Sequence, residues 1–538
     1  MKRMQSGDES SRIRTEIESG QTVLGMEFGS TRIKAVLLDR SFAPIAGGET
    51  IWGNRLENGI FTYHADEMIS GLQSTYAALK KDVGDRYGAL LQHIGAIGVS
   101  GMMHGYFAFD SAWHQLVPFY TWRNTMTKEA AEKLSALFDF NIPQRWSVAH
   151  LYQAMLSGQE HLAELSHLTT LAGWMHYRLT GVNAVGAGEA SGMFPIDPAT
   201  GTYDAVMAEK MDRLLQNYGL NLRVSSLFPK VLAAGEDAGF LTPEGALLLD
   251  PEGDLAPGIF FAPCEGDAGT GMAATNSLHV GTGNVSAGTS DFAMVVVGRK
   301  LPPHREIDMV ATPAGQPVAM VHCNNFTSDL NAWIQLFLQF SKRIGADVSL
   351  DELYPILFRE ALSGARDGGG LLSYNYSSGE GVTDIDAGRP VFLRKPDAEL
   401  TLPNFMRTHL MSALATLKIG LDILTKKEQV SIDTLYGHGG FFKTPEVGQR
   451  FLAAAANVPI SVMETAGEGG PYGMALLAAF RIWKQDGEGL EDFMEKRVFS
   501  ETESTVVQPD PEDVRGFDDF IVQYEKAFDV ERTATARF

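Results

Sequence analysis

The most informative pattern in the chain is a short turn of glycine and hydroxyl residues between two apolar runs. It occurs as Glu27-Phe28-Gly29-Ser30-Thr31, flanked by apolar residues over 23–26 and 33–38. It returns in altered form about half the chain later, as Ser286-Ala287-Gly288-Thr289-Ser290. Such runs predict strands, and the glycine turns between them let backbone N–H groups point at an anion. Either turn alone is typical of an ordinary hairpin, but the pair indicates two lobes that grip one polyphosphate.

The remaining pattern of apolar and polar residues is of the α/β type. Strand and helix signals alternate after the first turn, the middle of the chain is mainly helical, and a second α/β unit opens near Val280. We expect helices over 65–87, 129–138, 150–156, 328–343, 404–424 and 446–457, and strands over 94–100, 259–262, 292–297 and 434–436.

Two lobes follow from this pattern. We expect a mobile tail over 1–22, a first lobe over 23–278 and a second lobe over 279–538. Near the end, Phe517, Phe520 and Tyr524 are spaced as one face of a helix over about 510–530. We expect this last helix to dock back onto a lobe, with the first lobe as one option.

The composition and net charge of the chain limit the classes of partner that it can bind. The chain has 538 residues, 44% of them hydrophobic, and a net charge of −22, which argues against nucleic acid and anionic membrane as partners. The two cysteines exclude a disulfide framework, and neither a signal peptide nor a membrane-spanning run is evident. A cytoplasmic protein is therefore expected, and its oligomeric state is left open, a homodimer included.

A carboxylate pair provides the first candidate chemistry. Glu265 and Asp267 follow the short apolar strand over 259–262 and precede a helix of small residues. A carboxylate at the end of such a strand is placed to act as a general base. Asp267 also fits the role of a helix N-cap. The run 269–274 matches G-x-G-x-x-A, but the acidic residue that a nicotinamide site requires does not follow at the expected distance.

A second group of polar residues follows the strand over 94–100. Met103-His104-Gly105 comes first, and Trp122-Arg123 lies a little further on. A small polar ligand could meet His104 there, and a Trp–Arg pair can stack on and hydrogen-bond a sugar. A buried structural histidine and a surface packing pair are the alternatives.

Glycine runs late in the chain are the third feature. Gly439 and Gly440 precede Lys443, and a further run covers 467–473. Such turns let a flat ligand or a phosphate approach the backbone closely, although glycine runs also mark many loops. A Walker A sequence is absent, so a nucleotide would not be bound in the manner of a P-loop.

Taken in order, these segments resemble the FGGY family of carbohydrate kinases, in the actin, Hsp70 and hexokinase superfamily. The resemblance covers nearly everything from Val23 to Phe538. It implies an α/β fold of two ribonuclease-H-like, actin-type ATPase lobes with a central cleft that holds ATP, Mg²⁺ and a small sugar. The residues 103–105 are similar to the substrate signature of xylulokinases.

The resemblance also implies roles for individual residues. Asp267 would be the catalytic base, and Glu27 and Asp267 would hold Mg²⁺. The implied sugar contacts are Met103, His104, Gly105, Trp122, Arg123, Glu265 and Asp267. The implied ATP and phosphate contacts are Gly29, Ser30, Thr31, Lys34, Gly288, Thr289, Ser290, Gly439, Gly440 and Lys443, with 437–443 and 467–473 as the adenosine motif.

Two departures from the family pattern bear on these roles. Glu27 stands where the family usually has Asp, and His438 and Lys443 stand where it more often has Gly and a small polar residue. Glu27 could instead be a solvated surface charge. We expect an ATP-dependent kinase of a ketopentose, with D-xylulose first and L-ribulose second. The alternative is an ATP-dependent conformational or binding protein on the same scaffold, without a sugar substrate.

Overall fold

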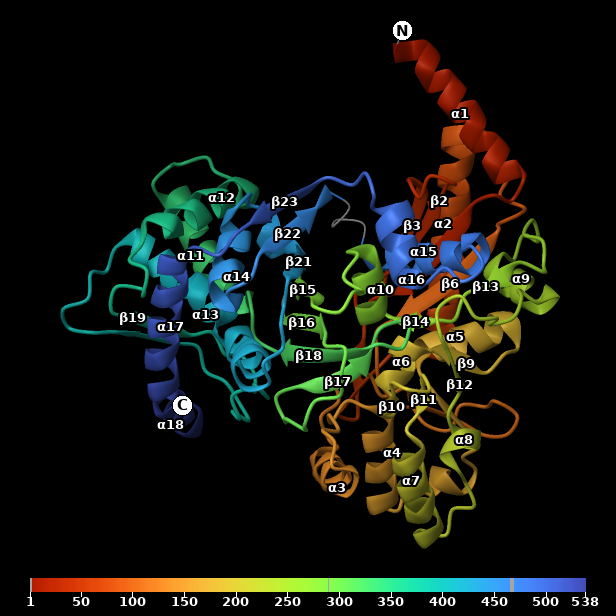
Figure 1. Ribbon diagram of the computed structural model, residues 1–538, viewed down its shortest axis with the longest axis horizontal. Coiled ribbons are helices and arrows are strands. Elements are labelled where there is room, and N and C mark those ends of the chain that lie inside the picture. Colours follow the sequence, from red (N-terminus) through yellow and green to blue (C-terminus); the bar gives the residue numbers. More distant parts are fainter. Residues whose placement is uncertain (1, 289, 465–468) are drawn as a thin grey trace. The chain divides into compact units, whose positions relative to one another are not determined.

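The computed structural model describes residues 2–288, 290–464 and 469–538. Its contacts divide the chain into two compact units (Figure 1). Unit 1 comprises residues 1–278, 309–318 and 468–501, and unit 2 comprises residues 279–308, 319–467 and 502–538. Both units mix strands and helices, as the sequence pattern predicted.

Unit 1 is built on a six-stranded sheet with the strand order β13-β6-β1-β2-β3, in which β14 also pairs with β6. Its strands are β1 (Val23–Phe28), β2 (Arg32–Leu38), β3 (Pro44–Ile51), β6 (Ala96–Gly101), β13 (Phe260–Phe261) and β14 (Glu265–Gly266). β1 and β2 form the antiparallel hairpin around the first glycine turn, whereas β6 runs parallel to both β1 and β14. The carboxyl ends of β1, β6 and β14 therefore meet at one edge.

Helices cover both faces of this sheet. α15 (Gly469–Trp483) packs on β1 and β6, and it also lies against α10 (Asp267–Ala274), as Figure 1 shows. α2 (Ala65–Tyr87) packs on β2 and β3, and α5 (Leu171–Thr180) packs on β6. The predicted helix over 65–87 is thus confirmed to the residue.

Glycines let these elements approach with backbone against backbone. A Cβ at Gly25 of β1 would lie 2.1 Å from the carbonyl oxygen of Pro471, and one at Gly473 of α15 would lie 1.9 Å from that of Thr270. Real Cβ atoms do not come so close to a carbonyl oxygen, so only glycine fits at these two crossings. The contact of α15 with β1 and α10 is therefore fixed by two small residues.

The middle of unit 1 is mainly helical, as predicted. Its elements are α3 (Lys128–Phe138), α4 (Ser147–Leu156), α6 (Ala187–Ser191), α7 (Ala205–Asn217), α8 (Val224–Leu227) and α9 (Pro243–Leu249), with the strands β7 (Phe107–Phe109), β8 (His167–Thr169), β9 (Ala184–Gly186), β10 (Ile196–Asp197), β11 (Thr202–Tyr203) and β12 (Lys230–Leu232). The small ribbon β4 (Arg55–Glu57) and β5 (Ile60–Thr62) precedes α2, and α16 (Leu490–Phe493) follows α15. α6 contacts both β14 and α10, so it lies against the point where the chain passes from β14 into α10.

Unit 2 repeats the hairpin arrangement in a seven-stranded sheet of order β17-β18-β16-β15-β21-β22-β23. The strands of this sheet are β15 (Thr282–Ala287), β16 (Asp291–Val296), β17 (Asp308–Ala311), β18 (Pro317–Cys323), β21 (Thr434–His438), β22 (Ile460–Met463) and β23 (Ser504–Val507), although residues 309–318 of β17 and β18 are grouped with unit 1 by their contacts. β15 is antiparallel to β16 and parallel to β21, as β1 is to β2 and β6. The similarity of the two turns in sequence therefore reflects the same strand pairing in both units.

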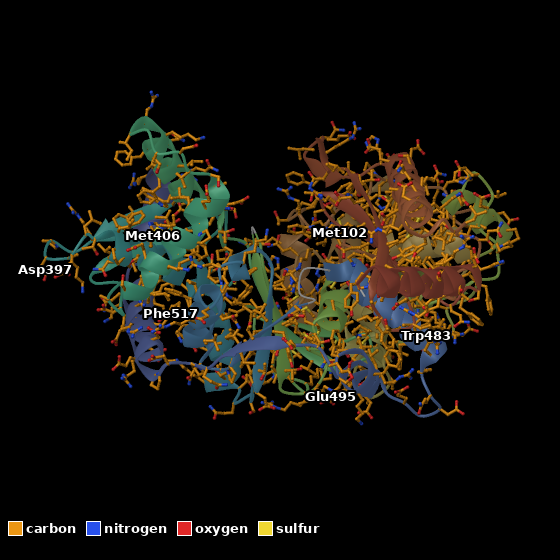
Figure 2. The ribbon with its side chains drawn as sticks, turned by 90° about the horizontal axis from the view of Figure 1, so that it is seen from above. Met102, Asp397, Met406, Trp483, Glu495 and Phe517 are labelled. Carbon is orange, nitrogen blue, oxygen red and sulfur yellow. The ribbon has the colours of Figure 1, made fainter. Side chains whose placement is uncertain are left out.

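The helices of unit 2 include a C-terminal pair that packs within this unit. They are α11 (Ser328–Arg343), α12 (Leu350–Glu360), α13 (Leu402–Asp422), α14 (Val447–Ala456), α17 (Pro511–Lys526) and α18 (Phe528–Arg537), and the ribbon of β19 (Leu371–Tyr374) and β20 (Val391–Arg394) adjoins α13. α17 contacts α13, α14 and β19, and Figure 2 labels its Phe517 and Met406 of α13 within the same unit. The last helices therefore pack on elements of unit 2.

The start of the chain also differs from expectation. The segment expected to be a mobile tail is helical over Lys2–Glu18 (α1) and contacts α2. Ile13 and Ile17 are buried in the core of unit 1, and Arg12 pairs with the buried carboxylate of Asp39 at 2.9 Å. The sequence analysis missed this docking because, in the part of α1 whose side chains are described, the buried apolar residues are just Ile13 and Ile17.

The chain passes between the two units more than once. The first break falls between Leu278 and His279. However, residues 309–318 and 468–501, which the sequence analysis assigned to the second lobe, belong to unit 1. The second of these segments contains α15, whose glycine contacts with β1 hold it there.

We predict that Gly473→Ala destabilises the protein by about 3 kcal/mol or more, because the new methyl group would overlap the carbonyl of Thr270. Gly84→Ala is the matched control, since Gly84 is an exposed helical glycine of α2 with open space around its Cα. It should gain about 0.5–1 kcal/mol from the better helix former. Thermal unfolding of both variants tests the packing, and equal melting temperatures would contradict it.

Candidate active site

The first glycine turn is held from outside by two aromatic residues. Trp52 Nε1 donates to the carbonyl of Gly29 at 2.7 Å, and the Tyr63 hydroxyl donates to that of Ser30 at 2.7 Å. The rings of Trp52 and Tyr63 pack together, with their centroids 4.3 Å apart. The turn connecting β1 to β2 is therefore fixed in shape before any ligand arrives.

Glu27 lies at the end of β1, on the face of the sheet that α15 covers. Period-two alternation puts it on the same side as Gly25, and its cross-strand partner on β2 is Lys34. Its Oε2 atom is buried without a hydrogen-bond partner among the described residues and lies 1.6 Å from where a Cβ of Gly470 would stand. The first residues of α15 therefore close over this carboxylate.

Strand register brings Glu27 and Asp267 to the same edge. Glu27 pairs with Ser100 of β6, and Ser100 pairs with Glu265 of β14, so the three residues form one row across parallel strands. Asp267 stands two residues beyond that row, as the first residue of α10. Its Oδ1 accepts hydrogen bonds from the N–H groups of Ala268 (3.0 Å) and Met103 (3.2 Å).

Asp267 is the exposed member of a group of acidic side chains. Desolvation by the surrounding protein raises the pKa of Asp267, whereas hydrogen bonds from the backbone N–H groups of Met103 and Ala268 lower it. Its side chain is nevertheless open to solvent, so water limits this rise. Asp267 can therefore be an ionised carboxylate near neutral pH, as a general base must be.

The neighbouring carboxyl groups are shielded instead. Burial raises the pKa of Glu27 to about 7, with the charge of Asp267 adding to the effect and Lys34 opposing it. Burial raises the pKa of Glu265 to about 8, although backbone donors lower it. Neighbouring carboxyl groups with raised pKa values at one sheet edge are typical of functional sites.

Glu265 does not face solvent. Its Oε1 accepts the N–H of Gly188 at 3.2 Å, and its Oε2 accepts the N–H of Glu189 at 2.9 Å. The side chain is 1% exposed, and both oxygens are used to anchor α6. Each carboxylate oxygen of Glu265 already accepts a backbone hydrogen bond. This geometry therefore does not favour the predicted direct contact of Glu265 with the sugar.

The segment 103–105 packs tightly behind Asp267. His104 has a φ of +70°, its Nδ1 lies 3.1 Å from the carbonyl oxygen of Gly192, and it is buried. Gly105 has a φ of +97°, and a Cβ there would lie 2.6 Å from the carbonyl oxygen of Tyr120. His104 is thus a buried histidine with a backbone partner, and Met103 is the residue of this segment that touches Asp267 through its N–H.

Trp122 and Arg123 differ in exposure. Trp122 is partly buried against the core of unit 1, whereas Arg123 is exposed, with its guanidinium 4.4 Å from the ring centre of Phe61. The Arg123 head remains accessible to a polar ligand. The contact with Phe61 is a cation–π interaction, so a surface packing role is also present.

In unit 2 the second glycine turn lies beside the loop that follows β21. Gly288 donates its N–H to the carbonyl of Ser290 at 3.0 Å, and its own carbonyl accepts the Thr327 hydroxyl at 2.6 Å. Thr289 lies outside the described residues. Gly439, at φ +105°, would place a Cβ 2.4 Å from the carbonyl oxygen of Ala287, so these two loops touch through their backbones.

The other predicted nucleotide residues divide between the two units. Gly440 opens a short 3₁₀ turn, Gly440–Phe442, and Lys443 follows it with an exposed side chain. His438 contacts Asn284 at 3.3 Å, and burial lowers its pKa to about 4. By contrast, residues 469–473 begin α15 in unit 1, while 467 and 468 lie outside the described residues.

The donor set at Glu27 and Asp267 suits a hard cation. Two neighbouring carboxylates supply oxygen atoms, which Mg²⁺ prefers, and Glu27 Oε2 has no competing donor. In the described part of the chain, no three His, Cys, Asp or Glu side chains gather to hold a metal by themselves. Mg²⁺ usually completes its shell with water and phosphate oxygens, so two carboxylates suffice.

Two contributors to this site were missed in the sequence. Gly470 shields Glu27, and Glu189 on α6 lies against Gly266, where its Oε2 is 2.7 Å from the position of a Cβ. The glycine run 467–473 drew attention to the first of these, but suggested contact with a nucleotide rather than with β1. The run Gly186-Ala187-Gly188 before Glu189 indicates close packing, but it does not predict which segment packs there.

Glu27 gives a test of this electrostatic picture. Because its pKa is raised in the folded protein, its contribution to stability is full below pH 4.5 and is lost as the pH rises through about 7. Wild type should therefore lose up to about 3 kcal/mol relative to Glu27→Gln across that interval. Denaturant unfolding at several pH values measures this. Glu132→Gln on the exposed face of α3 is the control, and parallel curves for wild type and Glu27→Gln would contradict the shielding of Glu27.

Comparisons with known proteins identify the family of the chain. Residues 22–269 match the N-terminal domain model of the FGGY family of carbohydrate kinases, and residues 283–482 match its C-terminal domain model. The xylulose kinase of Haemophilus influenzae is 22% identical over 523 residues, which cover 93% of this chain and 98% of that protein.

Two solved structures share the fold. The xyloylose kinase of Brucella ovis superposes with a TM-score of 0.76 at 20% identity, covering 95% of this chain and 99% of that chain. The gluconate kinase of Lactobacillus acidophilus also reaches 0.76, at 17% identity, covering 95% of this chain and 98% of that one. The predicted two-lobe fold of actin-type ATPases is thereby confirmed. Both domain models fit in order along the chain, and the protein belongs to the FGGY family of carbohydrate kinases and is a sugar kinase.

Proposed function

We propose that the protein transfers the γ-phosphate of ATP to a hydroxyl group of a ketopentose, with D-xylulose as the first candidate and L-ribulose as the second. The observation that carries the proposal is the row Glu27–Ser100–Glu265, which puts Asp267 beside the first glycine turn at one sheet edge. The match to a xylulose kinase over 93% of the chain supports the choice of sugar. The equal structural similarity to a gluconate kinase shows that the fold alone does not select the sugar.

Asp267 acts as the general base in this proposal. It is exposed, and two backbone N–H groups hold one of its oxygens, which leaves Oδ2 to accept the proton of the sugar hydroxyl. As the sugar hydroxyl loses its proton, its oxygen attacks the γ-phosphorus in line, and the bond from that phosphorus to the leaving ADP breaks. Because Met103 and Ala268 fix the carboxylate from behind, it does not need to reorient during proton transfer.

The glycine turns hold the phosphates in the same proposal. Trp52 and Tyr63 occupy carbonyl groups of the first turn, so its shape is set in advance. Mg²⁺ bound near Glu27 and Asp267 would neutralise the charge that builds up on the phosphoryl oxygens. The buried thiols of Cys264 and Cys323 are unpaired, which agrees with a reducing, cytoplasmic setting.

A coupled assay of ADP release with Mg·ATP tests the substrate. D-xylulose, L-ribulose, D-ribulose, L-xylulose, glycerol and gluconate should be compared at equal concentrations. We expect kcat/KM to be highest for one ketopentose, with D-xylulose first. A higher value for gluconate or glycerol would overturn the ketopentose assignment and leave the family assignment intact.

Asp267→Asn tests the base. The amide cannot take up the proton, so kcat should fall by about 10²–10⁴-fold while the ATP dissociation constant stays nearly unchanged. Single-turnover kinetics and calorimetry with ATP separate the two effects. Asp85→Asn, on the exposed side of α2, is the control. Turnover by Asp267→Asn at the wild-type rate would remove Asp267 from this role.

Two adjacent glycines test the nucleotide loop of unit 2. Gly439→Ala should lower the melting temperature and raise the KM for ATP about tenfold or more, because its methyl group would displace the carbonyl of Ala287. Gly440 has open space where a Cβ would stand. Gly440→Ala should therefore melt like wild type, and a raised KM for ATP in that variant would report close approach of the nucleotide itself. Unchanged ATP kinetics in both variants would exclude this loop from the ATP site.

A further inference from the structure

Glu189 of α6 is a buried carboxyl group without an evident structural purpose. Its side chain is fully buried, and among the described residues the Thr170 hydroxyl is the one side-chain donor that acts on it. A polar group in that position destabilises a protein unless it serves another end. The site described above uses the backbone of Glu189 but leaves its carboxyl group unexplained.

The backbone of α6 is fixed to the strand that leads to Asp267. The N–H groups of Gly188 and Glu189 both donate to the Glu265 carboxylate on β14, at 3.2 and 2.9 Å. Gly188 and Gly186 have no room for a side chain there, since a Cβ on either would lie within 2.4 Å of a Glu265 oxygen. Glu189 is therefore held at a set distance from the step between β14 and α10.

The side chain of Glu189 reaches back to that step. A Cβ on Gly266 would lie 2.7 Å from Glu189 Oε2, 2.1 Å from Met103 Cγ and 3.0 Å from Met103 Sδ. The Glu189 carboxyl and the Met103 side chain thus meet over the Cα of Gly266. Gly266 directly precedes Asp267, and the N–H of Met103 donates to Asp267. One carboxyl group consequently touches both segments that position the base.

No cation balances this carboxyl group in the described surroundings. The titratable groups that act on it or respond to it are Glu265, Asp267, Tyr203 and Cys264, all of them acids. Only the nearby Thr170 hydroxyl favours the charged form, and burial raises the pKa of Glu189 well above its ordinary value. A carboxyl group buried among acids in this way is neutral at physiological pH.

We propose that Glu189 is a positioning residue for Asp267, whose neutral carboxyl group, wedged between Met103 and Gly266, sets the direction in which Asp267 leaves β14. This inference rests on the proposed function, because it assigns Asp267 the role of base.

Three substitutions separate this role from simple packing. Glu189→Gln keeps the shape and the neutral charge, and its kcat should stay within about threefold of wild type. Glu189→Leu keeps the volume but loses the polar atoms, and Glu189→Asp shortens the arm. Both should lower kcat about tenfold or more with little change in the KM for ATP. Glu531→Gln, a buried glutamate of α18 in unit 2, is the control and should leave kcat unchanged.

Stability provides the decisive contrast. Glu189→Leu removes two buried oxygens for which Thr170 is the one side-chain donor, so its melting temperature should equal or exceed that of wild type while kcat falls. A packing residue would behave in the opposite way, losing stability and keeping kcat in the folded fraction. Wild-type kcat in a folded Glu189→Leu variant would overturn the proposal. If that variant does not fold, wild-type kcat in Glu189→Asp would overturn it instead.

Infrared difference spectroscopy tests the neutral state without any assay. Wild type at pH 7 should show the carbonyl stretch of a protonated carboxyl group that Glu189→Gln lacks, and loss of only a carboxylate band would overturn the proposal. This measurement also separates the two proposals. Inactivity of wild type toward every sugar tested would refute the proposed substrate class, whereas the infrared band would still support or overturn the neutral Glu189.

Discussion

The contact of α15 with β1 and α10 is the constraint on which the rest of unit 1 depends. At Gly25 and Gly473 the backbones come so close that any Cβ would overlap a carbonyl oxygen. This contact brings a segment from beyond residue 467 back to a sheet that begins at Val23. It also lays the first turn of α15 over Glu27, which removes that carboxylate from water. Packing and electrostatics at the site therefore have a single origin.

The register of the parallel strands then determines which acid is exposed. Glu27, Ser100 and Glu265 lie in one row, and the chain steps out of that row into α10 with Asp267 as its first residue. Glu27 is covered by α15 and Glu265 is occupied by α6, whereas Asp267 projects beyond both. Because the covered acids cost stability when ionised, the negative charge at neutral pH concentrates on the residue that water and ligand can reach.

Much of this arrangement could be predicted from the sequence, since the signals were local. The helix over 65–87 and the two hairpin turns depend on periodicity and turn residues, and the structure has them where expected. The position of residues 468–501 and the docking of α17 could not be read in this way, because they depend on contacts between distant segments. The run 269–274, which the sequence analysis did not accept as a nicotinamide site, lies within α10. The burial of Glu265 and Glu189 could not be read from the sequence for the same reason, because the two residues contact each other across 76 positions of the chain.

The class of reaction and the choice of sugar depend on different parts of the protein. The class is shown by the two family-domain matches along the chain. The fold rests on backbone features, namely two hairpins with a parallel neighbouring strand each, and these tolerate wide changes in side chains. That explains how TM-scores of 0.76 accompany identities of 20% or less, and how a xyloylose kinase and a gluconate kinase superpose equally well. The choice of sugar is left to exposed side chains, and Arg123 is the exposed basic one among the predicted sugar contacts. A guanidinium stacked on Phe61 can turn toward a hydroxyl or a carboxylate, so we expect this position to contribute to any discrimination between a ketopentose and an acidic sugar.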